Sequence, residues 1–408
     1  MDTSAPSSAL SPLRHPAFRL LWTATLVSNL GSLIQMVGAA WAMTGLTSSA
    51  GMVALVQASA TLPIMALAMV AGAIADNFDR RRVMLAAQLF MAVVSILLSI
   101  AAWAGWLGPW SLLGFTFLIG AGAAMHLPSW QASMRDLVPL SDLPGAIALN
   151  SVGFNLMRSV GPALGGLIVA AAGAPAAFAL NAASYFAVIA ALLLWRHERE
   201  PARLPAERLG SAIRDGLRYV ALSPNLMRVM ARAFLFGFAA VSVMALLPLI
   251  ARDRLAGSAT VYGALLGVFG LGAIGGAFAS ARLRSLAALE VIIRGAFVAS
   301  AAGALVLAFA RTPGAAAPGL VVCGAAWVLA LSHFNVSTQL AAPRWVVGRA
   351  LALYQTMSFG GMALGAWVWG ALAEAGTLPL AMATSAAALV MGALLGVVLP
   401  MPDLGTVN

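Results

Sequence analysis

Apolar segments long enough to cross a lipid bilayer follow one another along the whole chain. A helix needs about 20 predominantly apolar residues to cross the hydrocarbon core. Twelve such segments can be placed, at 17–43, 50–75, 83–104, 109–134, 146–172, 175–195, 226–251, 259–281, 290–310, 314–341, 348–373 and 377–400. With 62% hydrophobic and 9% charged residues, the chain is too apolar for a soluble globular protein. The sequence therefore predicts an all-α membrane protein with twelve transmembrane helices.

The second half of the 408-residue chain repeats features of the first half. At an offset of half the chain length, Gly72 corresponds to Gly276, Gly161 to Gly365 and Gly166 to Gly370. Internal repeats are typical of membrane transporters, and their substrate sites lie between the repeats. We therefore expect two pseudo-symmetric six-helix bundles with a binding site between them.

The basic residues are distributed unevenly between the two sides of the predicted membrane. All 23 of them are arginine, and the net charge is +10. Most lie at the termini or between spans on one side, whereas Arg252, Arg254 and Arg311 lie on the other. Cytoplasmic loops of membrane proteins carry an excess of Arg and Lys, so both termini are predicted to be cytoplasmic. This distribution indicates a lipid bilayer as the partner of the charged segments and argues against nucleic acid.

One long polar stretch, at 196–225, divides the chain. It predicts an N-terminal six-helix bundle at 1–196, a cytoplasmic linker at 197–225 and a C-terminal six-helix bundle at 226–408. Within the linker, Leu209, Ile213, Leu217 and Val220 recur at helical spacing. This pattern predicts an amphipathic helix on the cytoplasmic membrane face. No polar segment is long enough for a soluble catalytic domain.

Motifs for catalysis, metal binding and nucleotide binding are absent from the sequence. Cys323 is the only cysteine, and the four histidines have no cysteine partners at metal-ligand spacing. The sequence also lacks the Gly-Lys-Ser/Thr motif that binds nucleotide phosphates. We expect a protein that is not an enzyme, with no metal and no cofactor.

Several short motifs resemble those of one transporter family. They are the charged motif of residues 72–82, Arg14-His15-Pro16-Ala17-Phe18-Arg19, Trp41-Ala42-Met43-Thr44, the segment 127–132 and the segment 150–166. With the twelve spans and the repeat, the chain resembles the major facilitator superfamily, and within it the enterobactin-exporter-like (transmembrane secretion effector) branch of bacterial efflux proteins. The resemblance implies the major facilitator fold, a place in the bacterial inner membrane and transport by alternating access.

The charged motif is predicted to act as a conformational latch between the halves. An acidic side chain at the end of one helix can accept hydrogen bonds from the free amides at the start of another. Asp76 ends the second span on the side where the eleventh span begins, and Gly72 would let the two helices approach closely. The resemblance implies that such a latch favours the outward-open state. The predicted latch residues are Gly72, Asp76, Asp79, Arg80 and Arg349; the alternative for Arg80, Arg81 and Arg82 is that they only fix the topology.

The fifth span carries an antiporter-type motif, Gly161, Pro162, Gly165 and Gly166. Proline kinks the helix and the glycines permit tight packing, so packing alone explains these residues and export is implied by the resemblance. Met157 replaces an earlier glycine of the family motif. One turn before Pro162, Arg158 lies about 12 residues, or roughly 18 Å, into the span. We expect Arg158 and Asn155 to face the cavity and attract an anionic or polar group; the alternatives are a contact with the kinked backbone and snorkelling to the surface.

The resemblance implies that spans 1, 4, 7 and 10 line the substrate cavity. Further candidates for the cavity are Asn29, Gln35, His126, Trp130, Phe234, Phe238, His333, Asn335, Tyr354 and Gln355. For each of these residues, packing between helices is an equal alternative.

We expect a monomeric secondary active transporter that exports a small amphipathic molecule, such as a drug, a siderophore or a related metabolite. Protons are the expected coupling ion, although no Asp or Glu lies in the middle of a span. Proton coupling would therefore use His126, His333, Asp76 or a carboxylate of the substrate. The alternatives are a lipid or lysolipid flippase and a non-transporting membrane sensor or scaffold.

Overall fold

A computed structural model describes residues 10–195, 218–343 and 346–402. Within these ranges it leaves out the side chains of Met69, Ala73, Ala75, Asp76, Asn77, Asn155, Ser159 and Ala281. The described residues are almost all helical and contain no strand. The predicted amphipathic linker helix falls mostly outside them; its end, at 218–222, is helical.

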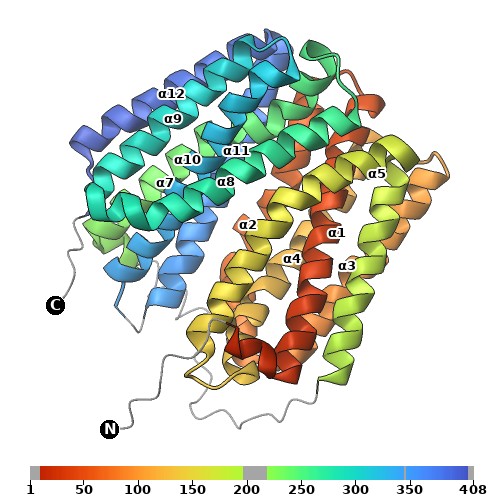
Figure 1. Ribbon diagram of the computed structural model, residues 1–408, viewed down its shortest axis with the longest axis vertical. Helices are drawn as coiled ribbons and strands as arrows, with labels where there is room; N and C mark the ends of the chain where they lie inside the picture. The colour runs from red at the N-terminus through yellow and green to blue at the C-terminus, as the bar shows by residue number, and fades with distance from the viewer. Residues whose placement is uncertain (1–9, 196–217, 344–345, 403–408) are drawn as a thin grey trace.

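The chain runs through a succession of long helices (Figure 1). They are α1 (Pro16–Leu46), α2 (Ala50–Asn77), α3 (Arg80–Trp103), α4 (Pro109–Leu137), α5 (Leu143–Leu194), α7 (Pro224–Leu249), α8 (Ala259–Leu286), α9 (Leu289–Phe309), α10 (Pro313–Ala341), α11 (Val347–Ala375) and α12 (Leu378–Val398). A short 3-10 helix (Ser11–Arg14) precedes α1, and a π-helix (Ile250–Arg254) follows α7. Within the described residues, ten helices are long and apolar enough to cross a membrane.

The helix α5 covers two crossings. Gly173 interrupts it with φ of 78°, in the left-handed region that favours glycine, and Pro175 follows. The chain turns back at this point (Figure 1), so the segments before and after Gly173 run in opposite directions. With this turn and the 29-residue helix α11, the helices are consistent with the twelve crossings predicted from the sequence.

Local sequence explains where many helices begin. Ser49, Asp79, Ser223, Thr312 and Thr377 each precede a helix and accept a hydrogen bond from a backbone amide of its first turn. Such N-caps satisfy amides that have no partner within the helix.

The helices form two groups with the same internal packing. In the first group, α1 packs against α5 and α2 against α4; in the second, α7 packs against α11 and α8 against α10. The two groups meet where α2 packs against α11 and where α5 packs against α8. In the repeat, α2 corresponds to α8 and α5 to α11, so each of these pairs is the counterpart of the other. We call the side of the molecule where α1 begins and α12 ends the terminus side, and the opposite side the far side.

The second group has a dense aromatic core around α7. Phe236 lies 5.1 Å from Phe297, 6.2 Å from Trp327 and 6.3 Å from Phe334, measured between ring centroids. Edge-on and tilted arrangements at these distances are the favourable ones for aromatic rings. At the terminus-side end of this core lies Arg232, whose side chain is fully buried.

Arg232 ties three helices of the second group together. Its guanidinium donates to Glu290 at the start of α9, at 3.2 Å, and to the carbonyl oxygen of Leu399 after α12, at 3.0 Å. The other carboxylate oxygen of Glu290 accepts from the amide of Met401 at 2.7 Å. The sequence gives no sign of this buried pair, because Arg232 and Glu290 lie on different helices.

Candidate functional site

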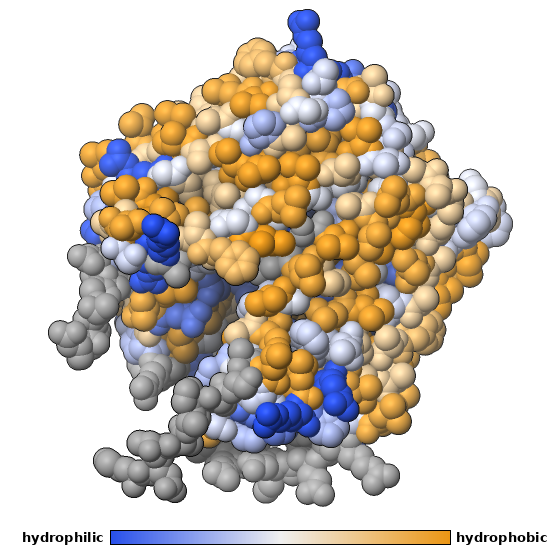
Figure 2. Space-filling model, viewed as in Figure 1, coloured by the Kyte–Doolittle hydropathy of each residue, from blue (hydrophilic) through white to orange (hydrophobic). Residues whose placement is uncertain are grey.

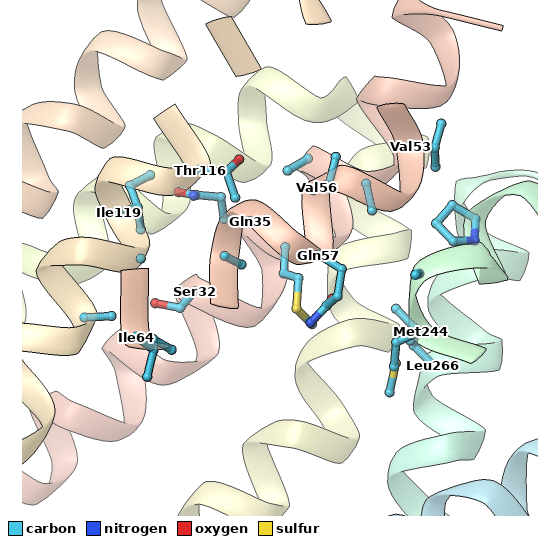
Figure 3. Close-up of a pocket in the computed structure, with 18 of the residues that line it drawn as sticks. Ser32, Gln35, Val53, Val56, Gln57, Ile64, Thr116, Ile119, Met244 and Leu266 are labelled. Atoms are coloured by element: carbon cyan, nitrogen blue, oxygen red, sulfur yellow. The ribbon is translucent and has the colours of Figure 1, made fainter. Parts of the chain in front are cut away.

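A cavity lies between the two groups of helices (Figure 3). It holds about 920 Å³ of empty space, including the part open to solvent. Ser32, Gln35 and Thr116 lie on one side of it, Met244 and Leu266 on the opposite side, and Gln57 between them (Figure 3). Helices α1, α2, α4, α7 and α8 and the second segment of α5 all contribute side chains.

The lining is neutral and mostly apolar. Its polar members are Ser32, Gln35, Gln57, Thr116, Tyr185 and Tyr262, and none of the lining residues is charged. Met36 and Met244 add flexible side chains that adapt to ligands of different shape.

A buried hydrogen-bond network holds the polar side of the cavity. The amide oxygen of Gln35 accepts from Ser95 on α3 at 3.1 Å and from the Asn181 amide on α5. Asn181 also donates to the hydroxyl oxygen of Tyr185 at 3.0 Å. Because all these groups are satisfied within the first group of helices, Gln35 and Tyr185 present a fixed surface to the cavity.

On the far side, α5 and α8 touch backbone to backbone. A Cβ added to Gly166 would lie 2.6 Å from the carbonyl oxygen of Ala259 and 2.7 Å from Cα of Gly263. A Cβ added to Gly263 would lie 2.6 Å from the carbonyl oxygen of Pro162. Two facing glycines thus permit a close approach between the two groups. We call this contact the α5–α8 closure.

The other two glycines of the antiporter-type motif pack within the first group. A Cβ on Gly161 would lie 2.8 Å from Cβ of Leu33, and one on Gly165 would lie 3.1 Å from Cα of Ile34, both on α1. The motif therefore supports one face of α5 against α1 and another against α8.

The same far side carries polar contacts between the groups. The Glu374 carboxylate at the end of α11 accepts from the Ser49 hydroxyl at 2.7 Å and from the Gly51 amide at 2.9 Å, both at the start of α2. Arg252 donates to the carbonyl oxygen of Thr44. Trp41 of α1 stacks on Tyr262 of α8 with ring centroids 6.1 Å apart.

Toward the terminus side the two groups diverge. A Cβ on Gly360 of α11 would still lie 2.9 Å from the sulfur of Met65 on α2. A Cβ on Gly72 or Gly348 would meet no described atom within 4 Å, so within the described residues Gly72 makes no close approach to α11 in this conformation. Figure 2 shows the recess between the groups on this side. The Asp76 side chain, the centre of the predicted latch, lies outside the described residues.

The other charges of the motif bind within the first group. Asp79 caps α3 by accepting from the amide of Arg82 at 2.9 Å. Arg80 donates to Asp136 at 3.0 Å and to the carbonyl oxygen of Ala132 at 3.1 Å, both on α4. Asp79 and Arg80 thus fix α3 and α4 in this conformation.

Arg81 has a structural contact in addition to any effect on topology. It donates to the carbonyl oxygens of Leu192, at 2.6 Å, and Leu193, at 3.1 Å. These carbonyls end α5 and have no amide partner in the helix, so Arg81 acts as a C-terminal cap.

A polar cluster joins the starts of α1 and α5 on the terminus side. Asp142 accepts from the Ser11 hydroxyl at 2.7 Å and contacts Nε2 of His15 at 2.8 Å. The hydrogen bond from Ser11, together with His15, lowers the pKa of the Asp142 carboxyl below its ordinary value. Asp142 is therefore ionised at neutral pH.

Arg158 projects from α5 toward the second group of helices. Its guanidinium carbon lies 5.9 Å from the ring centroid of Trp327 on α10. Arg158 is half-buried, whereas Trp327 is buried. The contact joins the two groups on the terminus side of the α5–α8 closure, because Arg158 precedes Pro162 by one helical turn. Asn155, its expected neighbour, has a side chain outside the described ones.

Among the predicted cavity residues, Gln35 lines the cavity and several others pack between helices instead. Trp130 is buried in the core of the first group and donates to the amide oxygen of Asn150 at 3.1 Å. Tyr354 donates to the carbonyl oxygen of Leu331 on α10 at 3.0 Å. Phe238 packs on Trp369 with ring centroids 5.1 Å apart and stacks with Phe234 with ring centroids 6.5 Å apart. Large aromatic side chains at these positions contact neighbouring helices, which is the alternative given for them from the sequence.

The predicted histidines also lie away from the cavity. His333 is buried, and its Nδ1 contacts the carbonyl oxygen of Leu329 in its own helix at 2.7 Å. His126 lies 3.4 Å from the amide nitrogen of Gln88 on α3. Asn335 accepts from Gln339 on the same helix at 2.6 Å. The remaining candidates, Asn29 and Gln355, are half-buried and do not line the cavity.

The expected lining by spans 1, 4, 7 and 10 is correct for α1, α4 and α7, whereas α10 is replaced by α2 and α8. The predicted candidates did not include Ser32, Gln57, Thr116, Tyr185 or Tyr262. Their signal in the sequence is weak, because single hydroxyl and amide groups occur in most of the spans. Within the described residues, no group of three or more His, Cys, Asp or Glu side chains is placed to hold a metal ion.

Apolar helices in two repeated groups with a cavity between them define a multi-pass membrane protein with the architecture of a transporter. Residues 7–408 match the family model described as transmembrane secretion effector, and the chain belongs to this family of major facilitator transporters. The family is one of transporters and not of enzymes, and a small-molecule substrate is the expectation for its class.

Curated relatives of the chain are transporters. The multidrug efflux pump Tap of Mycobacterium tuberculosis is 28% identical over 51% of this chain and 51% of its own length. The staphyloferrin A transporter of Staphylococcus aureus is 24% identical over 63% of this chain and 64% of its own. Macrolide efflux protein A of Streptococcus pyogenes is 24% identical over 62% of this chain and 66% of its own length. The chain thus spans about half to two thirds of the length of these relatives.

Solved structures share the fold at low sequence identity. The nucleoside transporter NupG superposes with a TM-score of 0.73 at 13% identity, over 94% of this chain and 98% of that one. A bacterial homolog of the human lysosomal transporter Spinster superposes with a TM-score of 0.69 at 15% identity, over 95% of both chains. These similarities establish the major facilitator fold.

Proposed function

We propose that the protein is a secondary active exporter of a small amphipathic molecule and that the structure represents its inward-facing state. The observation that carries this proposal is the asymmetry of the interface between the two groups. The α5–α8 closure and the Glu374–Ser49 contact join the groups on the far side. On the terminus side, a Cβ on Gly72 or Gly348 would meet no atom within 4 Å among the described residues. Alternating access requires such a one-sided closure, which a rocking of the two bundles then reverses.

The bundles that move are residues 1–196 and 226–408, joined by the linker 197–225. The arginine distribution supports a cytoplasmic terminus side and hence cytoplasmic termini. A cytoplasmic opening would allow substrate to enter the cavity from the cell interior, and the bacterial relatives support a place in the inner membrane.

The cavity chemistry supports an amphipathic substrate. Apolar and methionine side chains bind the hydrophobic part of a ligand without strict shape demands, while Gln35, Gln57 and Tyr185 can hydrogen-bond a polar part. Relatives described as a multidrug efflux pump and as macrolide efflux protein A support export of such molecules.

The proton gradient is the proposed energy source, and a single protomer carries the complete cavity. Asp76 is the favoured proton carrier, because it ends α2 on the side of the recess and His126 and His333 lie away from the cavity. In the outward-facing state, Asp76 is proposed to accept hydrogen bonds from the start of α11.

Transport in inverted membrane vesicles tests the proposal. Vesicles that contain the protein are expected to accumulate a fluorescent macrolide or dye when a proton gradient is imposed, and a protonophore is expected to abolish the accumulation. Asp76→Asn should reduce uptake several-fold at an unchanged protein level, and a double His126→Gln/His333→Gln variant should retain it. Vesicles that accumulate no compound of a broad panel of drugs and siderophores would contradict export.

A further inference from the structure

Arg158 and Trp327 occupy a part of the interface that the neutral cavity does not include. The guanidinium of Arg158 belongs to the first group of helices, and the indole over which it lies belongs to the second. Both residues are near the middle of their membrane-crossing segments, since Trp327 is equally far from the two ends of α10.

The charge of Arg158 has no carboxylate counterpart nearby in the described part of the chain. The acidic residues described for the long helices lie at or near helix ends, such as Glu290 on α9, Glu374 on α11 and Asp136 on α4. Arg158 also makes no hydrogen bond or ion pair to any described residue, and its one recorded contact is the face of Trp327. A cation held at this depth without a counter-charge is costly, and such residues mark substrate or ion pathways.

Arg158 lies on the terminus side of the α5–α8 closure and is half-buried. The α5–α8 closure begins one helical turn farther along α5, at Pro162, and shuts off the far side. In the second group, Trp327 packs against Phe269 of α8 and Phe236 of α7, with ring centroids 6.3 Å and 6.2 Å apart. A half-buried guanidinium thus lies next to a rigid aromatic wall, on the side of the closure where the two groups diverge.

We propose that Arg158 and Trp327 form a subsite for the anionic group of an aromatic substrate, such as a carboxylate or phenolate attached to a ring. The guanidinium offers a planar set of donors that matches a carboxylate, and the low polarity around it strengthens the attraction. The ring of the ligand packs against Trp327, which Arg158 already contacts. This subsite rests on the proposed transport function for its purpose, but its occupancy is a binding property that can be measured separately.

A set of three probes with one ring and three charges tests the subsite. The probes are 2-naphthoate, 2-naphthamide and 2-naphthamidine, which carry a negative, a neutral and a positive group. Their dissociation constants are measured by calorimetry on the full-length protein in lipid nanodiscs at neutral pH. We expect naphthoate to bind at least tenfold more tightly than the other two, which is the size of effect known for hydrogen bonds to charged groups.

Variants separate a binding role from a structural role. Arg158→Gln should remove the preference for naphthoate and leave the affinity for naphthamide within about twofold, and Arg158→Lys should restore part of it. Trp327→Phe keeps a ring and should cost less affinity than Trp327→Leu for all three probes. Arg311→Gln is the matched control, because it removes one exposed arginine on the far side and should change nothing.

Other outcomes would overturn the subsite. These are equal binding of the three probes, binding of none of them, or a naphthoate preference that survives in Arg158→Gln. A loss of affinity for all three probes together with a lower melting temperature would assign Arg158 to helix packing instead. If naphthoate binds but the vesicles accumulate neither naphthoate nor any compound of the panel, the proposed export is refuted and the subsite is not.

Discussion

The carboxylate of Glu374, at the far-side end of α11, accepts a 2.7 Å hydrogen bond from Ser49, the residue that caps α2. The same oxygen accepts from the amide of Gly51 in the first turn of α2. A carboxylate at the end of α11 thus faces the free amides at the start of α2. On the terminus side, the same arrangement is expected in the opposite sense, with Asp76 at the end of α2 facing the start of α11. The two arrangements lie at opposite ends of the same helix pair, so each is suited to stabilise one of the two states of the transporter.

Glu374→Ala is expected to weaken the far-side closure and expose the cavity on that side. Two hydrogen bonds to a carboxylate are lost, and nothing replaces them at the start of α2. The reporter is Gln57→Cys in a Cys323→Ala background, labelled in intact cells with a membrane-impermeant maleimide. Labelling should rise several-fold.

The matched variants for this experiment are Glu374→Gln and Arg311→Gln. Glu374→Gln keeps an oxygen that can accept from Gly51 and should give a smaller rise, whereas Arg311→Gln changes an exposed far-side charge and should give none. Labelling of the Glu374→Ala variant at the unaltered rate would show that the contact does not hold the closure.

Gly263→Ala is expected to prevent the α5–α8 closure. The added Cβ would lie 2.6 Å from the Pro162 carbonyl oxygen, and backbone on both sides leaves it no room. Uptake in vesicles should fall about tenfold, and labelling of the cavity reporter from the far side should increase.

Gly275→Ala, in the same helix, is the control for that change. A Cβ at Gly275 meets no atom within 4 Å, so the variant shares the altered helix propensity without the clash. Comparable transport by the two variants would mean that the close approach of α5 and α8 is not needed in the transport cycle.

Asp142→Asn is expected to lower the melting temperature of the purified protein at pH 7. The hydrogen bond from Ser11 and the contact with His15 lower the pKa of Asp142, so the ionised carboxylate stabilises the folded state. Because the pKa is lowered by folding, the carboxylate contributes to the free energy of unfolding at any pH above its ordinary pKa of 3.8. This contribution is lost as the pH falls through the pKa of the folded state. The difference between variant and parent should therefore be constant near neutral pH and shrink below about pH 4. A difference that keeps its size down to about pH 3 would contradict an electrostatic origin.

Glu290→Leu is expected to destabilise the second group strongly, because it leaves the buried guanidinium of Arg232 without its carboxylate. Removal of one partner of a buried ion pair costs about 3–5 kcal/mol. The double variant Arg232→Met/Glu290→Leu should recover much of the loss, since it removes both charges. Thermal unfolding in detergent measures both effects, and a double variant less stable than Glu290→Leu would show that Arg232 acts mainly through its hydrogen bond to Leu399.

Much of the fold follows from patterns that are local in the sequence. Lengths of apolar segments predict the crossings, and the offset between Gly166 and Gly370 predicts the repeat. The glycines and proline of the fifth span predicted a tightly packed helix, and Gly161, Gly165 and Gly166 all contact neighbouring helices. The depth of Arg158 indicated a special position, because the bilayer penalises any charge that is placed there.

The cavity could not be predicted in the same way. Gln35 was expected to line it and does, whereas Trp130 fills the core of the first group and Ser32, Tyr185 and Tyr262 were missed. In an all-apolar helix the faces toward lipid, toward a neighbouring helix and toward a cavity have nearly the same composition. Helical periodicity therefore cannot assign a face to a single polar residue.

The sequence by itself determined the membrane class, the duplicated architecture and the family, because hydrophobic length and repeated motifs are properties of one chain segment at a time. Only the tertiary structure decided which contacts join the two groups, where the cavity lies and which side is open. Those features depend on how α2 meets α11 and how α5 meets α8, helices far apart in the chain. Such contacts can change between the states of a transporter while the sequence stays the same.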